Sequence, residues 1–276
     1  MINISKLSFG YKKRQPLFQN LNLELKSGSI YGLFGMNGAG KTTLLKHIAG
    51  LLFAQEGRCE ILGKDVSQRL PEVLSNLFVI PEEFALPHIR ISTFVDLNAP
   101  FYRMFDHGLF KNYLDEFEIS NGKILTAYSY GQKKKFLIAF GLATKSKILL
   151  MDEPTNGLDI PSKSQFRRTL ASVTAEDRCI VISTHQVRDL ASIIDHITIL
   201  DNGRIIFHHD ILHISQKLAF VKIEDECADK ALYAEDILGG KSAIIASQGH
   251  DTAIDPELLF NGVIKNHSAI NNVLKN

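Results

Sequence analysis

The sequence predicts an α/β fold, in which a parallel β-sheet is wound with helices. Three observations lead to this class. Apolar runs typical of strands, at residues 29–35, 147–152, 178–184 and 196–200, alternate with segments whose apolar residues recur at helical spacing. A glycine-rich loop joins the first run directly to a helical segment. With 45% hydrophobic and 22% charged residues, the composition is that of an ordinary globular protein.

The first of these runs closes an N-terminal region that we expect to be β structure. INISKLSF and LNLELK alternate apolar and polar residues, as half-buried strands do, and predict an antiparallel β subdomain. SIYGLFG is almost continuously apolar, which is typical of a strand covered on both faces. A short apolar run, LFVI at 77–80, predicts a further strand, and DNGRIIFH predicts a hairpin turn and one more.

Two other regions differ from this pattern. Residues from about 84 to 144 carry few strand signals, and STFVDL, GLFKNYLDEF and KKKFLIAFGLA have helical spacing, so we expect a mostly helical insert. Residues 211–276 hold six Lys, no Arg and nine Asp or Glu, a shift in composition from the rest. We therefore expect a main domain over 1–210, with the helical insert at about 84–144, and a small C-terminal appendage over 211–276.

The charge and the cysteines restrict the class of protein. Lys and Arg number 31 against 30 Asp and Glu, so the global field does not indicate binding to nucleic acid or to an acidic membrane surface. Cys59, Cys179 and Cys227 are scattered and odd in number, which is typical of core residues in a reducing compartment. No secretory signal and no run of about 18 apolar residues is visible, so we expect a cytoplasmic protein.

Residues 35–42, GMNGAGKT, match the phosphate-loop pattern G-x-x-x-x-G-K-[ST] between a strand and a helix. Gly35, Gly38 and Gly40 allow the backbone N–H groups to converge on phosphate oxygens at the start of the helix. Lys41 is expected to reach the β- and γ-phosphates, and the Thr42 hydroxyl to bind Mg²⁺. The alternative is a glycine turn that happens to precede Lys-Thr. The motif in this context predicts the core of a P-loop NTPase.

KILLMDEP supplies carboxylates at the end of a second buried strand. Asp152 emerges at the carboxyl end, where open α/β sheets bind ligands, and is expected to hold Mg²⁺ through water. Glu153 points differently because side chains alternate along a strand, so it is a candidate to orient and deprotonate water for attack on the γ-phosphate. The alternative is a strand that simply ends in solvated acids.

Five ordered stretches resemble the nucleotide-binding subunits of ATP-binding cassette (ABC) transporters over roughly residues 1–210. They are FGYKK, GMNGAGKTT, YSYGQ at 128–132, LLMDEPTNGLD at 149–159 and STH at 183–185. Agreement among five motifs in the correct order is far more specific than any one of them.

The resemblance implies roles for further residues. Tyr11 matches the aromatic residue that stacks on adenine, Asp159 the acidic residue that couples two sites across a dimer, and His185 the histidine that contacts the γ-phosphate. An exposed tyrosine at a strand end and a capping or packing histidine are the alternatives. The implied nucleotide contacts are Tyr11, Gly35, Asn37, Gly38, Ala39, Gly40, Lys41, Thr42, Thr43, Ser129, Gly131, Gln132 and Asp159; the implied catalytic residues are Glu153, His185 and Lys41.

The family works as a head-to-tail dimer, in which ATP and Mg²⁺ lie between the phosphate loop of one subunit and the signature loop of the other. The resemblance therefore implies a homodimer, or a heterodimer with a related ATPase subunit. It also implies a separate transmembrane permease subunit, docked on the helical insert. The chain would then lie at the inner face of the cell membrane, bound through that subunit, with no nucleic acid partner.

The sequence departs from the family pattern at two places. Where a glutamine usually contacts Mg²⁺ the sequence has IPEE, and Glu82 is the best match, with Glu83 as the alternative register. The signature LSGGQ is replaced by YSYGQ, which keeps Ser129 and Gly131. The run at 133–135 of three lysines is interpreted as the solvated first turn of a helix, with steering of a nucleotide or a membrane partner as the alternative.

Two functions are compatible with these motifs. The first is an ATPase that powers transport through the permease; its short core resembles ABC-2 type export systems. The second is a soluble ABC-type ATPase acting on ribosomes or DNA. The single phosphate loop and the absence of a heptad run in the sequence favour transport.

Overall fold

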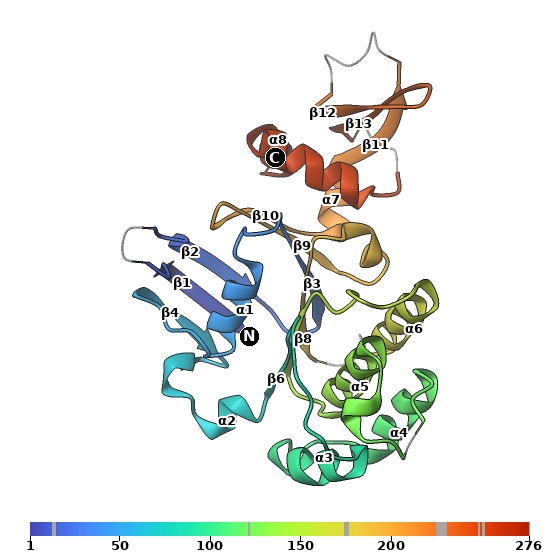
Figure 1. Cartoon of the computed structure of the whole chain (residues 1–276). Coiled ribbons are helices and arrows are strands. Elements are labelled where there is room, and N and C mark those ends of the chain that lie inside the picture. The colour runs from blue at the N-terminus through green and yellow to red at the C-terminus, as the bar shows by residue number, and fades with distance from the viewer. Residues whose placement is uncertain are drawn as a thin grey trace.

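The computed structural model describes residues 1–12, 15–120, 122–173, 177–224, 231–247, 249 and 252–275. It confirms the predicted α/β class, with three β-sheets and helices packed around them (Figure 1). Cys59 and Cys179 are buried, as expected, while Cys227 lies outside the described residues.

The central sheet has six strands in the order β10-β9-β3-β8-β7-β6, all parallel except β10. Four of them are the apolar runs seen in the sequence, and they are buried almost throughout because both faces are covered. The strands are β3 (Ser29–Phe34), β6 (Leu77–Ile80), β7 (Ile148–Asp152), β8 (Cys179–Thr184), β9 (His196–Asp201) and β10 (Arg204–Asp210).

The N-terminal sheet is antiparallel, in the order β2-β1-β4-β5. It consists of β1 (Ile2–Phe9), β2 (Phe18–Leu25), β4 (Glu56–Ile61) and β5 (Lys64–Asp65). The predicted antiparallel subdomain is therefore present, but it includes two strands from beyond the phosphate loop that the sequence pattern did not indicate. β4 reads EGRCEI and buries only Cys59 and Ile61, so it lacks a regular alternation.

Helices cover both faces of the central sheet (Figure 1). The face that carries Tyr31, Leu150 and Val181 packs on α1 and the antiparallel sheet, whereas the opposite face, with Leu149 and Ile180, packs on α4, α5 and α6. The helices are α1 (Lys41–Ile48), α2 (Pro71–Leu74), α3 (Ile91–Asn98), α4 (His107–Glu116), α5 (Tyr130–Ala143) and α6 (Ile160–Ala171), with 3₁₀ turns η1 (Val66–Gln68), η2 (Ala99–Phe101), η3 (Leu125–Ala127) and η4 (Val187–Asp189).

The chain after β10 forms α7 (Ile211–Lys217), a small antiparallel sheet and α8 (Pro256–Lys275). The sheet has the order β11-β13-β12, from β11 (Leu218–Ile223), β12 (Tyr233–Ile237) and β13 (Gly240–Ala246). Leu258, Leu259 and Val263 of α8 belong to the same apolar cluster as the helices that cover the central sheet. Among the described residues, no helix is long and apolar enough to cross a membrane.

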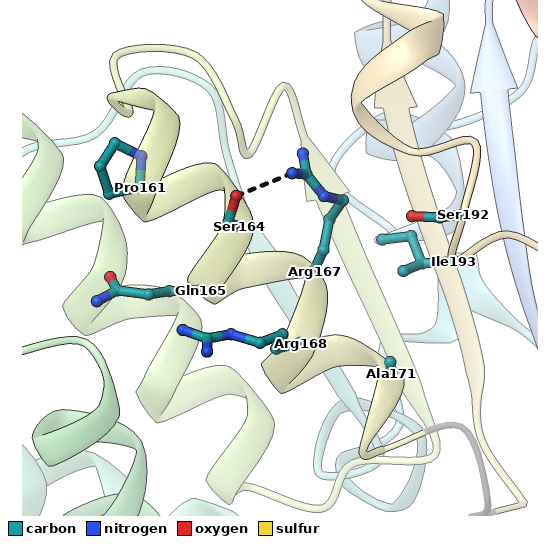
Figure 2. A pocket seen from close by; sticks show the side chains of 8 residues that line it. All are labelled: Pro161, Ser164, Gln165, Arg167, Arg168, Ala171, Ser192 and Ile193. Carbon is teal, nitrogen blue, oxygen red and sulfur yellow. Dashed lines mark hydrogen bonds between the residues drawn. The ribbon is translucent and has the colours of Figure 1, made fainter.

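A shallow hollow lies on the outer face of α6 (Figure 2). Arg167 and Arg168 line it, and the Arg167 guanidinium donates a hydrogen bond to Ser164 Oγ over 3.0 Å. None of the residues that the sequence predicts for nucleotide binding lines this hollow.

Candidate ATP-binding site

The phosphate-loop motif forms the turn between β3 and α1. Gly38 and Gly40 have φ angles of 82° and 108°, in the left-handed region that side chains other than glycine rarely adopt. Gly40 is the N-cap of α1 and offers no side-chain cap, so the first N–H groups of the helix are left for a ligand. The loop borders a cleft of about 810 Å³, lined by Tyr11, Lys12, Gln15, Pro16, Leu17, Asn37, Gly38, Gly40, Lys41, Thr42, Thr43, Glu82, Glu153, Asn156 and His185.

Lys41 lies in this cleft with only 7% of its surface exposed. Its Nζ donates hydrogen bonds to the carbonyls of Gly35, at 2.8 Å, and Met36, at 3.3 Å, and lies 3.9 Å from Glu153 Oε1. Burial lowers the pKa of Lys41, and the carboxylate of Glu153 opposes that shift most strongly among its acidic neighbours. The ammonium group is therefore held by weak carbonyl acceptors that an anionic ligand can replace.

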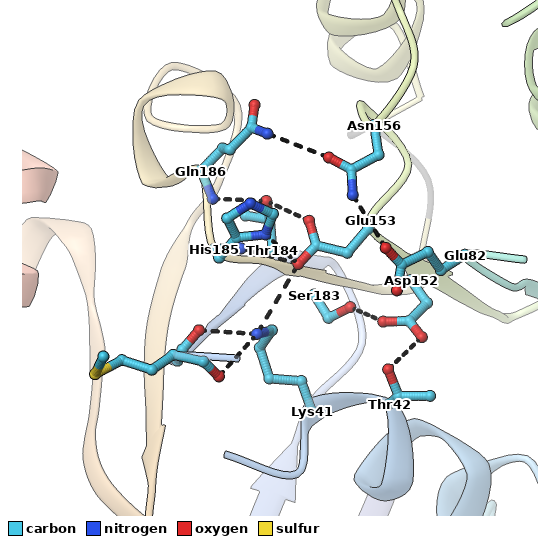
Figure 3. Close-up of polar contacts among 12 residues, drawn as sticks. Lys41, Thr42, Glu82, Asp152, Glu153, Asn156, Ser183, Thr184, His185 and Gln186 are labelled. Carbon is cyan, nitrogen blue, oxygen red and sulfur yellow. Dashed lines mark hydrogen bonds and ion pairs between the residues drawn. The ribbon is translucent and has the colours of Figure 1, made fainter. Parts of the chain in front are cut away.

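Asp152, at the carboxyl end of β7, joins the phosphate loop to the neighbouring strand (Figure 3). The Thr42 hydroxyl donates to Asp152 Oδ2 over 2.6 Å, and Ser183 of β8 donates to Oδ1. The carboxylate is 4% exposed. Two oxygen groups predicted to bind a metal, 110 residues apart in the sequence, are thus brought into direct contact.

Glu153 is held by three donors from β8 and the residue that follows it (Figure 3). Thr184 Oγ1 donates to Oε2 over 2.9 Å, while the His185 backbone N–H, at 3.0 Å, and ring Nδ1, at 2.8 Å, both contact Oε1. Because a carboxylate only accepts hydrogen bonds, Nδ1 is the donor of this pair and Nε2 is left for another partner. Glu153 has a φ of 45°, a strained value for a residue other than glycine.

Glu82 enters the cleft from the segment after β6. Its Oε1 accepts a hydrogen bond from Asn156 Nδ2 over 3.1 Å, and Asn156 Oδ1 accepts one from Gln186 Nε2 over 3.2 Å. Glu83 is exposed and does not line the cleft. Of the two candidate positions, Glu82 is therefore the one that lies in the cleft.

Tyr11 stands at the rim of the cleft with 63% of its surface exposed. Its hydroxyl lies 3.1 Å from Thr43 Oγ1, and its ring meets Phe9 edge to face at 5.1 Å. The ring is thus fixed at one edge while a large part of its surface stays open. An exposed, fixed aromatic face of this kind can stack on a base.

The YSYGQ segment starts helix α5 and does not line the cleft. Ser129 is the N-cap: its Oγ accepts from Gln132 N over 3.3 Å, and Gln132 Oε1 accepts from Ser129 N over 3.0 Å, which completes a capping box. A Cβ at Gly131 would lie 3.1 Å from the carbonyl oxygen of Gly157, so the backbone passes close to the loop before α6. Asp159 is the exposed N-cap of α6, 2.9 Å from Ser162 N, and also lies outside the cleft.

The two tyrosines of this segment have structural partners. Tyr128 is buried, and its hydroxyl donates to the Ser120 carbonyl over 2.5 Å. Tyr130 donates to the Glu82 carbonyl over 2.7 Å. The first tyrosine anchors the start of α5, and the second connects it to the segment after β6.

The prediction that the lysine run forms a solvated helical turn is wrong for Lys134, which has no exposed surface. Lys133 and Lys135 are partly exposed. Charge alone suggested solvation, but residues 81–84 cover this face of α5, a tertiary contact that a local charge pattern does not reveal.

Several residues that hold the site together were not predicted from the sequence. Ser183, Thr184 and Asn156 orient Asp152, Glu153 and Glu82 respectively. They lie inside the STH and LLMDEPTNGLD motifs, so their positions in the sequence are a signal that could have identified them.

Comparison with known proteins places this site in a family. The family model described as "ABC transporter" matches residues 18–156. The bacitracin transport ATP-binding protein BcrA of Bacillus licheniformis is 27% identical, over 92% of this chain and 81% of its own length. The cobalt import ATP-binding protein CbiO of Salmonella paratyphi A is 30% identical, over 75% of this chain and 80% of its own length.

A solved structure of the ATP-binding subunit of an ABC transporter superposes with a TM-score of 0.70 at 25% identity, over 78% of this chain and 91% of that chain. The expected fold and family are thus confirmed. The chain belongs to the ABC transporter family, as an ATP-binding and ATP-hydrolysing subunit of a transport system.

Proposed function

We propose that residues 1–210 bind ATP with Mg²⁺ in the cleft and hydrolyse it between two subunits, and that this cycle drives a separate transmembrane permease subunit. The observation that carries the proposal is the hydrogen-bonded convergence of Thr42, Asp152, Glu153 and His185 beside Lys41 (Figure 3). These groups come from three different motifs, and together they supply the functions that phosphoryl transfer needs.

The oxygen groups present fit Mg²⁺. Thr42 Oγ1 and Asp152 Oδ2 lie 2.6 Å apart, and two adjacent ligands of an octahedral Mg²⁺ are about 2.9 Å apart at ordinary bond lengths. Glu82 also lines the cleft and adds a third oxygen group. Mg²⁺ bound there would neutralise charge that develops on the phosphate oxygens.

Glu153 is the proposed general base. Its carboxylate takes the proton of the attacking water, and the bonds from Thr184 and His185 fix the direction in which it faces. Lys41 exchanges the loop carbonyls for β- and γ-phosphate oxygens, and Nε2 of His185 is available to the γ-phosphate. Tyr11 stacks on adenine.

The second half of each site comes from another subunit. Ser129, Gly131, Gln132 and Asp159 lie outside the cleft of their own subunit, which suits contacts to a nucleotide held by a partner. Ser129 and Gly131 sit at a helix start, where N–H groups and the helix dipole favour phosphate. The partner is a second copy or a related ATPase subunit.

Localisation and domain division belong to the same proposal. The chain lies at the cytoplasmic face of the membrane, bound to the permease through the helical insert at about 84–144. Residues 211–276 form an appendage, which is supported by their separate sheet β11-β13-β12. The likeness to ABC-2 type export systems remains a prediction, and the names of the relatives, which are transport proteins, favour transport over a role on ribosomes or DNA.

The test is Glu153→Gln. The amide keeps an acceptor for His185 and a shape that fits the site, but it cannot take a proton, so turnover should fall by about 10²–10⁴-fold. With ATP and Mg²⁺ the variant should elute as a stable dimer in size-exclusion chromatography, and without ATP as a monomer. A variant that hydrolyses ATP at the full rate would remove Glu153 from this role.

A further inference from the structure

Lys134 of α5 is a lysine with 0% exposed surface. Lysines are almost never fully buried unless they are paired. Its Nζ donates hydrogen bonds to the backbone carbonyls of Pro81, at 3.2 Å, and Glu82, at 3.1 Å. Both acceptors are neutral, so the ammonium group is fixed in place by the segment that carries Glu82, without a carboxylate in direct contact among the described residues.

Tyr130, four residues earlier, lies on the same face of the helix and acts on the same segment. Its hydroxyl donates to the Glu82 carbonyl over 2.7 Å, and its ring stacks on Phe84 at 5.4 Å with an interplanar angle of 24°. The ammonium of Lys134 lies 5.3 Å from the Phe84 ring centre and 5.7 Å from that of Tyr130, within cation–π range. We call Tyr130 and Lys134, together with their contacts to residues 81–84, the α5 clamp.

The positive charge of Lys134 lies near the carboxylates of the cleft. Glu82 adds a third carboxylate to a cleft that already contains Asp152 and Glu153. Burial lowers the pKa of Lys134, and the charges of Glu82, Asp152 and Glu153 oppose this shift, in that order. The ammonium group therefore lies in the field of all three carboxylates.

We propose that Lys134 is a positioning residue for ATP hydrolysis, which holds the Glu82 segment against α5 and offsets the negative charge of the Glu82 side chain. The inference rests on the proposed function of the cleft. It has a consequence for the dimer, because α5 begins with Ser129 and Gly131. The helix that contacts the nucleotide of one site would then fix the position of Glu82 in the other.

The test compares steady-state ATP hydrolysis by the full chain carrying Lys134→Gln, Glu82→Gln, or both. Lys134→Gln keeps a hydrogen-bond donor but removes the charge, so kcat should fall roughly tenfold because the Glu82 carboxylate is left uncompensated, while KM for ATP changes less than about twofold. In the double variant the uncompensated carboxylate is gone, and kcat should recover to the value of Glu82→Gln alone. Lys133→Gln, the same change at a neighbouring lysine outside the clamp, should behave as wild type.

Tyr130→Phe guards against a folding defect, since Tyr130 is 45% exposed and the change removes only one hydroxyl. Loss of one hydrogen bond should lower kcat about two- to tenfold with KM unchanged. If Lys134 served only the stability of the fold, Lys134→Gln would lower the melting temperature, and adding Glu82→Gln would not restore kcat.

The inference is overturned if the double variant is no more active than Lys134→Gln, or if Tyr130→Phe and Lys134→Gln both match wild type. These outcomes differ from those expected if the proposed function is wrong. If it is wrong, the wild type itself would show no Mg²⁺-dependent ATP hydrolysis, or Glu153→Gln would retain this activity.

Discussion

Ser129→Arg separates the two roles of the serine that caps α5. In the monomer the change removes a capping box with hydrogen bonds of 3.3 and 3.0 Å, which costs about 1 kcal/mol and lowers Tm by about 2–4 °C. In the proposed dimer it also removes a contact to a charged phosphate at each of two sites. At about 1.5–3 kcal/mol per contact, the loss is about 3–6 kcal/mol, or roughly 10²–10⁴-fold in the dimerisation constant.

The assay is size-exclusion chromatography with ATP and Mg²⁺ in the Glu153→Gln background, at a series of protein concentrations. Asp106→Ala is the control, because Asp106 caps α4 through Leu109 N at 2.9 Å within the same helical insert. The control should lower Tm in the same way and still dimerise. If Ser129→Arg lowers Tm like the control but dimerises at the concentration of its parent, the reasoning that Ser129 contacts a partner's nucleotide is refuted.

Three further predictions follow from exposure, burial and backbone geometry. Tyr11→Ala should weaken ATP binding by about 1–3 kcal/mol, whereas Tyr11→Phe should not, because it keeps the ring. Equilibrium titration with ATP measures both, and an affinity of Tyr11→Ala equal to that of the wild type would exclude stacking. Burial lowers the pKa of His208, so the unfolded chain takes up a proton first and stability should fall as pH drops below about 6.5, by at most about 1.4 kcal/mol per unit. The fall in Tm between pH 7.5 and 5.5 should be smaller in His208→Gln, and an unchanged fall contradicts this. Gly203→Ala should lower Tm more than Gly63→Ala, because both have φ above 70° but only at Gly203 would a Cβ collide, 1.6 Å from the Leu17 carbonyl oxygen. Equal Tm values for the two variants would contradict this, because they would show that the turn at Gly203 adjusts to the added Cβ.

The sequence predicted those parts of the fold that depend on local burial. β7 and β8 are buried along their whole length, so a continuous apolar run was enough to locate them. β4 was missed because it buries little and contains Gly57, where a Cβ would lie 2.2 Å from the Lys6 carbonyl oxygen. Position 57 requires glycine because β1 passes too close for a side chain, and this is a tertiary constraint that a local pattern does not show.

In the site, too, local motifs were predictable from the sequence and long-range contacts were not. Lys41, Thr42 and Glu153 were predicted because each lies inside a motif with a defined chemistry. The bond between Asn156 and Glu82 joins residues 74 positions apart, and no local pattern specifies it. The buried state of Lys134 likewise depends on a segment more than fifty residues earlier, which the charge pattern of the helix does not encode.

The position of β6 has a consequence for local stability. Within the described residues, this four-residue strand is one edge of the central sheet and pairs only with β7. One side of its backbone lacks a neighbouring strand, so separating it from the sheet requires fewer hydrogen bonds to break than separating β7 or β8. Amide hydrogen exchange at 77–80 should therefore be faster than in the interior strands. The segment leading to Glu82 is thus attached to a strand that opens more easily than β7 or β8.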